Sequence, residues 1–116
     1  MSLAKKLNLK DGMALRVIGR PPGLDLEDVA TSTAPDASGL LLFVRTLAEV
    51  DAAGDPLVEA ASRDRIAWAA YPKAKLLGTD LNRDILNAHL QKRGIQGVRM
   101  ISIDETWSAM RFRPAR

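Results

Sequence analysis

The sequence predicts a single α/β domain, built on a mostly parallel sheet with helices on both faces and an antiparallel β-hairpin at the carboxyl end. An apolar run over 66–71 stops at a proline and is followed by a capped helix beginning at Asp80, which is half of a βαβ unit. The run 39–45 is almost continuously apolar, as is typical of a strand covered on both faces. Residues 98–113 alternate with a period of two about a short polar segment at 104–106, which indicates the hairpin.

Composition limits both the size and the class of the protein. The 116 residues suffice for one domain, 1–116, with its own core, and are too few for two ordinary ones. The absence of cysteine excludes disulfides, thiol nucleophiles and cysteine-ligated metals. Residues 1–10 lack an apolar stretch of signal-peptide length, and no apolar run is long enough to span a bilayer. We therefore expect a cytoplasmic protein that does not act at a membrane.

Charge is distributed unevenly along the chain. Residues 1–23 carry five basic and one acidic side chain, and residues 91–116 carry six and two. Residues 24–60, in contrast, carry one basic and eight acidic side chains. Basic residues gathered on one face would suit nucleic acid, but solvated helix faces and strand ends explain them equally well. The sequence alone therefore gives nucleic acid little support as a partner.

The amino-terminal elements are short. Residues 5–10 predict about one helical turn. Residues 14–19 predict a strand that ends at a Pro-Pro-Gly sequence, which leaves Arg20 at the strand's carboxyl end. The Thr-, Ser- and Asp-rich segment 30–38 predicts a loop, with a short edge strand possible near 29–32.

Two short helices should follow the central strand. Thr46 to Glu49 form a capping-box sequence, so a helix should begin at Leu47. Gly54-Asp55-Pro56 divides the region into helices over 47–53 and 56–62, because aspartate caps helices and proline suits a first turn. A single kinked helix is the alternative.

The helix over 80–93 closes with Lys92-Arg93-Gly94, cations followed by a carboxyl-terminal glycine. Its apolar residues recur at helical spacing, which predicts one face turned to the core. Across the whole domain we expect burial of Ile18, Leu41, Phe43, Ile66, Trp68, Ile85 and Leu90.

A three-residue turn in the hairpin would pair Ile103 with Trp107 and place Arg99 opposite Arg111. Like charges that face each other across a sheet are unfavourable. Either an acidic group should therefore lie between the two arginines, or the register should differ by one residue.

Three stretches, 42–45, 71–84 and 104–112, resemble a family of small uncharacterised bacterial proteins, a domain of unknown function. The resemblance covers most of the chain from residue 39 onward. It implies a compact α/β domain and transfers no catalytic residue. The element order also resembles a truncated class I S-adenosylmethionine-dependent methyltransferase, which implies a Rossmann-like core.

The methyltransferase resemblance departs from its pattern at the cofactor turn. Those enzymes have an acidic, glycine-rich turn after the first strand, so that backbone passes close to the cofactor. Here the turn contains two prolines, which donate no hydrogen bonds, and Arg20 stands where a small residue belongs. The cofactor therefore remains unknown.

The candidate site follows from strand polarity. The carboxyl ends of parallel strands lie at one edge of a sheet, so the polar and aromatic residues that follow them should gather there. Three cations beside the helix start at Asp80 predict an anion site. The alternative is solvated strand ends, with Asp80 capping its helix and Asp104 acting as a turn residue. The candidate ligand-binding residues are Arg20, Arg45, Tyr71, Lys73, Asp80, Asp104 and Trp107.

Catalytic motifs are missing from the sequence. It contains no Walker loop and no G-x-S-x-G elbow, and a single histidine, His89, makes a poor transition-metal site. We therefore predict a non-enzymatic or catalytically degenerate domain, with no catalytic residue and no metal, that binds a partner protein or a small anionic metabolite. A methyltransferase-like enzyme with an altered S-adenosylmethionine site and a nucleic-acid-binding protein are the alternatives.

Overall fold

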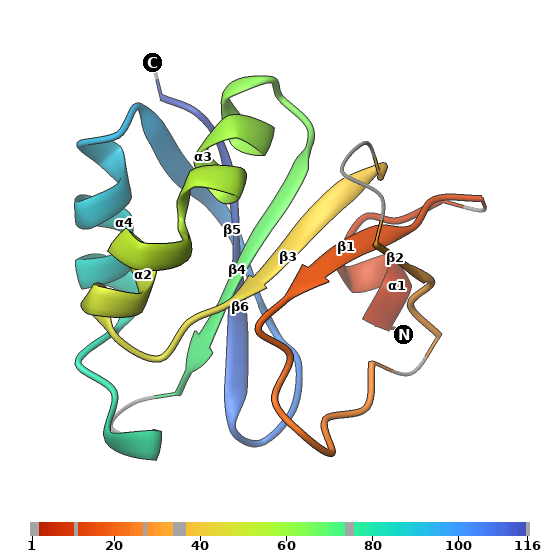
Figure 1. Cartoon of the computed structure of the whole chain (residues 1–116), viewed down its shortest axis with the longest axis horizontal. Helices are drawn as coiled ribbons and strands as arrows, with labels where there is room; N and C mark the ends of the chain where they lie inside the picture. The colour runs from red at the N-terminus through yellow and green to blue at the C-terminus, as the bar shows by residue number, and fades with distance from the viewer. Residues whose placement is uncertain (1–2, 11, 27, 34–36, 74–75, 116) are drawn as a thin grey trace.

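The computed structural model describes residues 3–10, 12–26, 28–33, 37–73 and 76–115, so residues 34–36 of the predicted loop lie outside the described residues. Six strands form one sheet in the order β2-β1-β3-β4-β6-β5 (Figure 1). The strands are β1 (Leu15–Ile18), β2 (Thr31–Ser32), β3 (Gly39–Phe43), β4 (Ile66–Pro72), β5 (Ile95–Ser102) and β6 (Trp107–Pro114). The helices are α1 (Leu3–Lys6), α2 (Leu47–Ala53), α3 (Asp55–Ser62), the 3₁₀ turn η1 (Leu76–Gly78) and α4 (Arg83–Gln91).

The sheet is mixed, and the prediction of a mostly parallel Rossmann-like sheet is wrong. β2, β1, β3 and β4 pair in parallel, but β2 has only two residues. The two longest strands, β5 and β6, pair antiparallel, and β6 also pairs antiparallel with β4. β4, α4 and β5 still form a parallel crossover, but β5 lies one strand away and β6 fills the gap. A helical crossover specifies that two strands run parallel, not that they are neighbours, and the error follows from that difference.

Helices cover the two faces of the sheet unequally, which corrects the expectation of helices on both. α2, α3 and α4 lie on one side in Figure 1, and α1 lies on the other. On the first side the core includes Leu42, Leu57 and Leu90. On the second side the four residues of α1 are supplemented by non-helical chain that buries Leu24 and Leu26. Among the described residues, no helix is long and apolar enough to cross a membrane.

The predicted pair of helices after β3 is confirmed. The Thr46 side chain caps α2 by accepting from the Glu49 N–H at 3.2 Å, and α3 begins immediately after Gly54. The predicted edge strand near 29–32 is β2. The start of the last helix differs from the prediction, because Asn82 caps α4 by accepting from the Ile85 N–H at 2.8 Å. The helix therefore begins at Arg83 rather than Asp80.

Burial follows the prediction at five of the seven expected positions. Leu41, Phe43, Ile66, Trp68 and Leu90 are buried. Ile18 is half-buried because it projects to the side of α2, α3 and α4, and β1 extends past these helices (Figure 1). Ile85 is 40% exposed, and its predicted burial is wrong. α4 packs through Leu86 and Leu90, spaced four residues apart, and Ile85 lies one position outside that stripe.

The terminal hairpin has the predicted register. The Ile103 N–H donates to the Trp107 carbonyl at 2.9 Å, and Arg99 lies opposite Arg111. A register irregularity between Gly97 and Arg99 precedes this pair. The register is not shifted, and no carboxylate of the described residues bonds to either arginine. Arg99 is exposed to solvent and the charge of Asp64 acts on Arg111, so the like charges are partly relieved.

Candidate functional site

The predicted cations at the carboxyl edge differ in how the fold uses them. Arg20 folds back on its own turn, and its Nε and Nη2 donate to the Leu24 carbonyl at 2.9 and 2.5 Å. Lys73 Nζ donates to Ser102 Oγ at 2.7 Å, which joins the end of β4 to the end of β5. Arg45 is exposed, and its guanidinium bonds to none of the described residues. Of the three, only Arg45 has a head group without such a bond.

The predicted carboxylates act as backbone caps. Asp80 Oδ1 accepts from the Leu47 N–H at 3.0 Å, so it caps α2 rather than the helix that follows it in sequence. Asp104 Oδ1 accepts from the N–H groups of Thr106 and Trp107, each at 2.8 Å, and closes the hairpin turn. Both carboxylates have the structural roles that the sequence offered as the alternative, although Asp80 caps a different helix.

The two predicted aromatic residues lie in different cores. Tyr71 is buried against the helix-covered face, where its Oη lies 3.5 Å from Met100 Sδ, and burial raises the pKa of its hydroxyl. Trp107 is buried on the opposite face, edge-to-face with Phe43 at a ring-centroid distance of 5.2 Å. The seven candidates therefore do not converge on one cavity.

A hollow of about 220 Å³ lies near the amino end of β3, beside α3. β1 extends the sheet past the helices, so the helix-side face of β1 and β3 is left partly open (Figure 1). Arg16 and Leu40 are cross-strand partners and therefore project on the same face. The described lining residues are Arg16, Ala37, Gly39, Leu40, Asp55, Pro56, Glu59, Ala60, Arg63 and Arg65.

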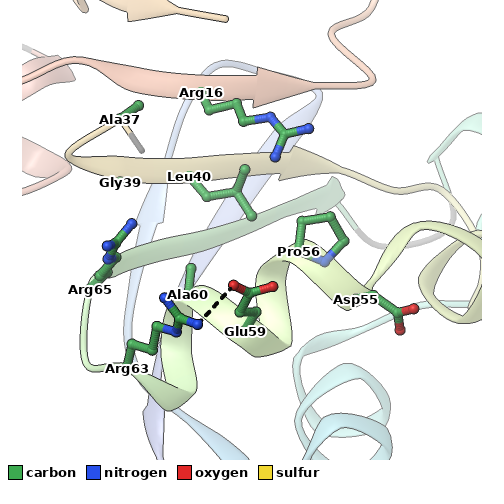
Figure 2. A pocket seen from close by; sticks show the side chains of 10 residues that line it. All are labelled: Arg16, Ala37, Gly39, Leu40, Asp55, Pro56, Glu59, Ala60, Arg63 and Arg65. Atoms are coloured by element: carbon green, nitrogen blue, oxygen red, sulfur yellow. Dashed lines mark ion pairs between the residues drawn. The ribbon is translucent and has the colours of Figure 1, made fainter. Parts of the chain in front are cut away.

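Three arginines from separate places in the chain meet at this hollow, which we call the arginine pocket. Figure 2 shows Arg16 on β1, Arg65 at the start of β4, and Arg63 after α3, arranged around Leu40. Arg63 is bound to Glu59 at 3.4 Å, and both side chains are mostly exposed. Arg16 and Arg65 bond to no carboxylate of the described residues. The pocket therefore holds two uncompensated positive charges.

The other acid at the pocket is directed elsewhere. Asp55 Oδ1 accepts from Arg93 Nη2 at 2.5 Å, across to the end of α4. Figure 2 shows the Asp55 carboxylate pointing away from Arg16 and Arg65. Leu40, Pro56 and Ala60 supply apolar surface between the charges. The arrangement suits a ligand that has both an anionic group and an apolar part.

The chemistry of the pocket favours binding over catalysis. Its described lining contains no histidine, serine, lysine or tyrosine, and its two carboxylates, Asp55 and Glu59, are each bound to an arginine. His89 lies elsewhere, with its Nε2 2.7 Å from Asp51 Oδ1 between α4 and α2. Among the described residues, no group of three or more His, Asp or Glu side chains is placed to hold a metal ion.

Sequence reasoning overlooked all three pocket arginines, although Arg16 carries a signal. It is the only charged residue in the strand 14–19, so its side chain must reach solvent or an uncovered part of the sheet. Arg63 and Arg65 flank Asp64 in a helix-to-strand turn, where charges are ordinary and nothing in the sequence distinguishes them.

The fold and the pocket together define a small mixed α/β domain with an arginine-lined cavity at the amino end of its central strands. No protein-family model matches the chain, and no curated protein matches it.

Proposed function

We propose that the protein binds a small organic anion in the arginine pocket. The observation that carries the proposal is the pair Arg16 and Arg65, two guanidinium groups beside one cavity that bond to no carboxylate of the part of the chain that the structure describes. Arginine forms planar, bidentate hydrogen bonds with carboxylates and phosphates. The apolar surface of Leu40, Pro56 and Ala60 would hold the body of the ligand.

The carboxyl edge, where the sequence predicted an anion site, is the weaker candidate. Lys73 and Arg20 already donate to protein oxygens, and Asp80 would place a negative charge beside the ligand. Binding there would require breaking hydrogen bonds that join one element to another. The guanidinium groups of Arg16 and Arg65 form no such hydrogen bonds with the described residues, so an anion can bind them without breaking a hydrogen bond of the fold.

Phenyl phosphate is a suitable probe, because it joins an apolar ring to a dianion. We expect it to shift amide resonances around Gly39 and Ala60 in an NMR titration, and Arg16→Gln or Arg65→Gln to weaken binding about tenfold or more, the range for one charge-assisted hydrogen bond. Benzyl alcohol, which keeps the ring without the charge, should bind far more weakly.

Arg45→Gln is the matched control, since it removes an arginine that is equally free but lies at the carboxyl edge. It should leave the affinity unchanged. If Arg45→Gln weakens binding and Arg16→Gln does not, the anion site lies at the carboxyl edge. If benzyl alcohol binds as tightly as phenyl phosphate, the arginines do not select an anion and the proposal fails.

A further inference from the structure

The terminal hairpin carries a second set of arginines, on the face of the sheet opposite α2, α3 and α4. Arg99 on β5 lies directly opposite Arg111 on β6, and Arg111 in turn pairs with Trp68, which belongs to the core on the α1 side. Arg113, two residues further along β6, projects on the same face. We call these three side chains the hairpin arginines.

Two of the hairpin arginines, Arg99 and Arg111, bond to no carboxylate of the described residues. Asp64 is bound to Arg113, whose Nε and Nη2 donate to its two carboxylate oxygens at 2.8 and 3.0 Å. Arg99 is exposed and bonds to no carboxylate of the described residues. Directly opposed like charges weaken a sheet, so the Arg99–Arg111 pair lowers the stability of the hairpin.

Arg111 is held in place but only partly satisfied. Its Nη1 donates to Asn8 Oδ1 at 3.1 Å, while its buried Nε has no hydrogen-bond partner among the described residues. Buried polar groups are nearly always paired, and the exceptions call for an explanation. Because that Nε is shielded from solvent, an anion beside Arg99 would approach the Nη atoms of Arg111 and supply negative charge between the two guanidinium groups.

The bond from Asn8 brings the other basic end of the chain to the same face. Trp68 Nε1 donates to the Leu7 carbonyl at 3.1 Å, so the amino-terminal segment is fastened beside β4 and β6. That segment carries Lys5, Lys6 and Lys10. Asp28 also lies beside this segment and accepts from the Ala4 N–H at 3.1 Å. Two stretches that the sequence separates, each with a net positive charge, therefore adjoin in the fold.

The surroundings of the hairpin arginines exclude some modes of recognition. All five aromatic side chains are buried, so none is free to stack on a base. Among the large apolar residues that the structure describes, only Val98 is exposed near the three arginines, because Met100 belongs to the other face. A protein partner would require a larger apolar centre. An interface of positive charge without apolar or stacking groups fits a phosphate backbone.

We propose that the hairpin arginines bind duplex nucleic acid through its phosphates, without reading base sequence, and that the amino-terminal lysines add positive charge to the same face of the molecule. Arg99 and Arg111 would each donate to phosphate oxygens. Arg113 would add positive charge beside them while it remains bound to Asp64. This site is separate from the arginine pocket, and either can fail without the other.

The test is fluorescence anisotropy of the full chain with a labelled DNA duplex of about 20 base pairs, between about 50 and about 200 mM salt. We expect binding that weakens steeply with salt and is equal for two duplexes of unrelated sequence. Arg99→Gln should reduce the salt slope by about one and weaken binding several-fold. Arg83→Gln removes the same charge from an exposed arginine on α4, on the other side of the sheet, and should change the affinity less than about twofold.

The Arg99 side chain is exposed and bonds to none of the described residues, so Arg99→Gln should not lower the melting temperature and should raise it slightly by removing the like charge opposite Arg111. A loss of affinity would therefore not reflect unfolding. Three outcomes would overturn the proposal: no binding at the lowest salt, equal effects of Arg99→Gln and Arg83→Gln, or competition by polyglutamate as effective as competition by unlabelled duplex. The second outcome would show a response to net charge alone, and the third would point to an acidic protein segment.

Discussion

Asp64 has two structural roles: it adopts a left-handed backbone conformation in a turn, and it forms an ion pair with Arg113. It lies in the turn between α3 and β4 with φ of 58°, in the left-handed region that aspartate tolerates better than most residues. Its carboxylate accepts two hydrogen bonds from the guanidinium of Arg113, near the end of β6. The turn that delivers the chain to β4 is thereby joined to the strand beside β4.

The pKa of the Asp64 carboxyl should depend on Arg113. The hydrogen bonds and charge of Arg113 hold that pKa below its usual range, so the pair stabilises the fold above the ordinary aspartate pKa, and this contribution is lost as pH falls through the lowered value. Arg113→Gln should raise the Asp64 pKa toward normal in an NMR titration. Arg113→Lys keeps the positive charge but not the paired N–H donors of the guanidinium, so it should give an intermediate Asp64 pKa. An unchanged Asp64 pKa in Arg113→Gln would show that Arg113 does not lower it.

At the scale of elements, side-chain caps connect helices that are distant in sequence. Thr46 caps α2 within its own turn, whereas Asp80 reaches the same helix from the segment before α4. Thr79 Oγ1 donates to the Arg45 carbonyl at 2.5 Å beside it. These bonds fasten the connection between η1 and α4 to the start of α2, so residues predicted to hold a ligand instead hold two segments together.

Asp80→Ala should therefore lower stability. Loss of the bond to the Leu47 N–H is expected to cost about 1 kcal/mol of unfolding free energy, the usual scale for a helix cap, measured by urea denaturation. Asp80→Asn keeps an acceptor oxygen and should lose less. If Asp80→Ala has the same urea midpoint of unfolding as the wild type, the cap does not contribute to stability, and Asp80 is again a candidate ligand-binding residue.

At the scale of the whole molecule, Trp68 joins the amino-terminal segment to the middle of the sheet. The side chain is fully buried on β4, and its indole N–H bonds to a carbonyl 61 residues away in sequence. Around it lie Leu3, Leu7 and Leu15, which form the core on the α1 side. The short helix α1 depends on this packing, because four residues are too few for a helix to persist alone.

Trp68→Phe should destabilise the fold by about 1–3 kcal/mol, because it leaves the Leu7 carbonyl without this donor and removes buried apolar surface. Trp107→Phe is the matched control: that indole is also buried, but its N–H bonds to none of the described residues. Equal losses in urea unfolding would show that packing alone matters. A larger loss of unfolding free energy for Trp68→Phe, together with faster hydrogen exchange in residues 3–8, would show that the hydrogen bond accounts for the difference.

The sequence by itself determined the local elements of this protein. The strand over 39–43, the divided helices after Thr46, and the hairpin about 104–106 could be predicted because apolar periodicity, caps and turn residues act within a few positions of one another.

Only the tertiary structure decided that β6 enters between β4 and β5, since strand order depends on which distant faces bury each other best, here including Phe112 and Met110. That order also decided which charges are compensated: Asp80 caps a distant helix, Asp64 pairs with Arg113, and Arg16, Arg65 and Arg99 are left without carboxylate partners among the described residues. Ion pairs between remote residues leave no local pattern, so the candidate sites became visible only once the strands were in place.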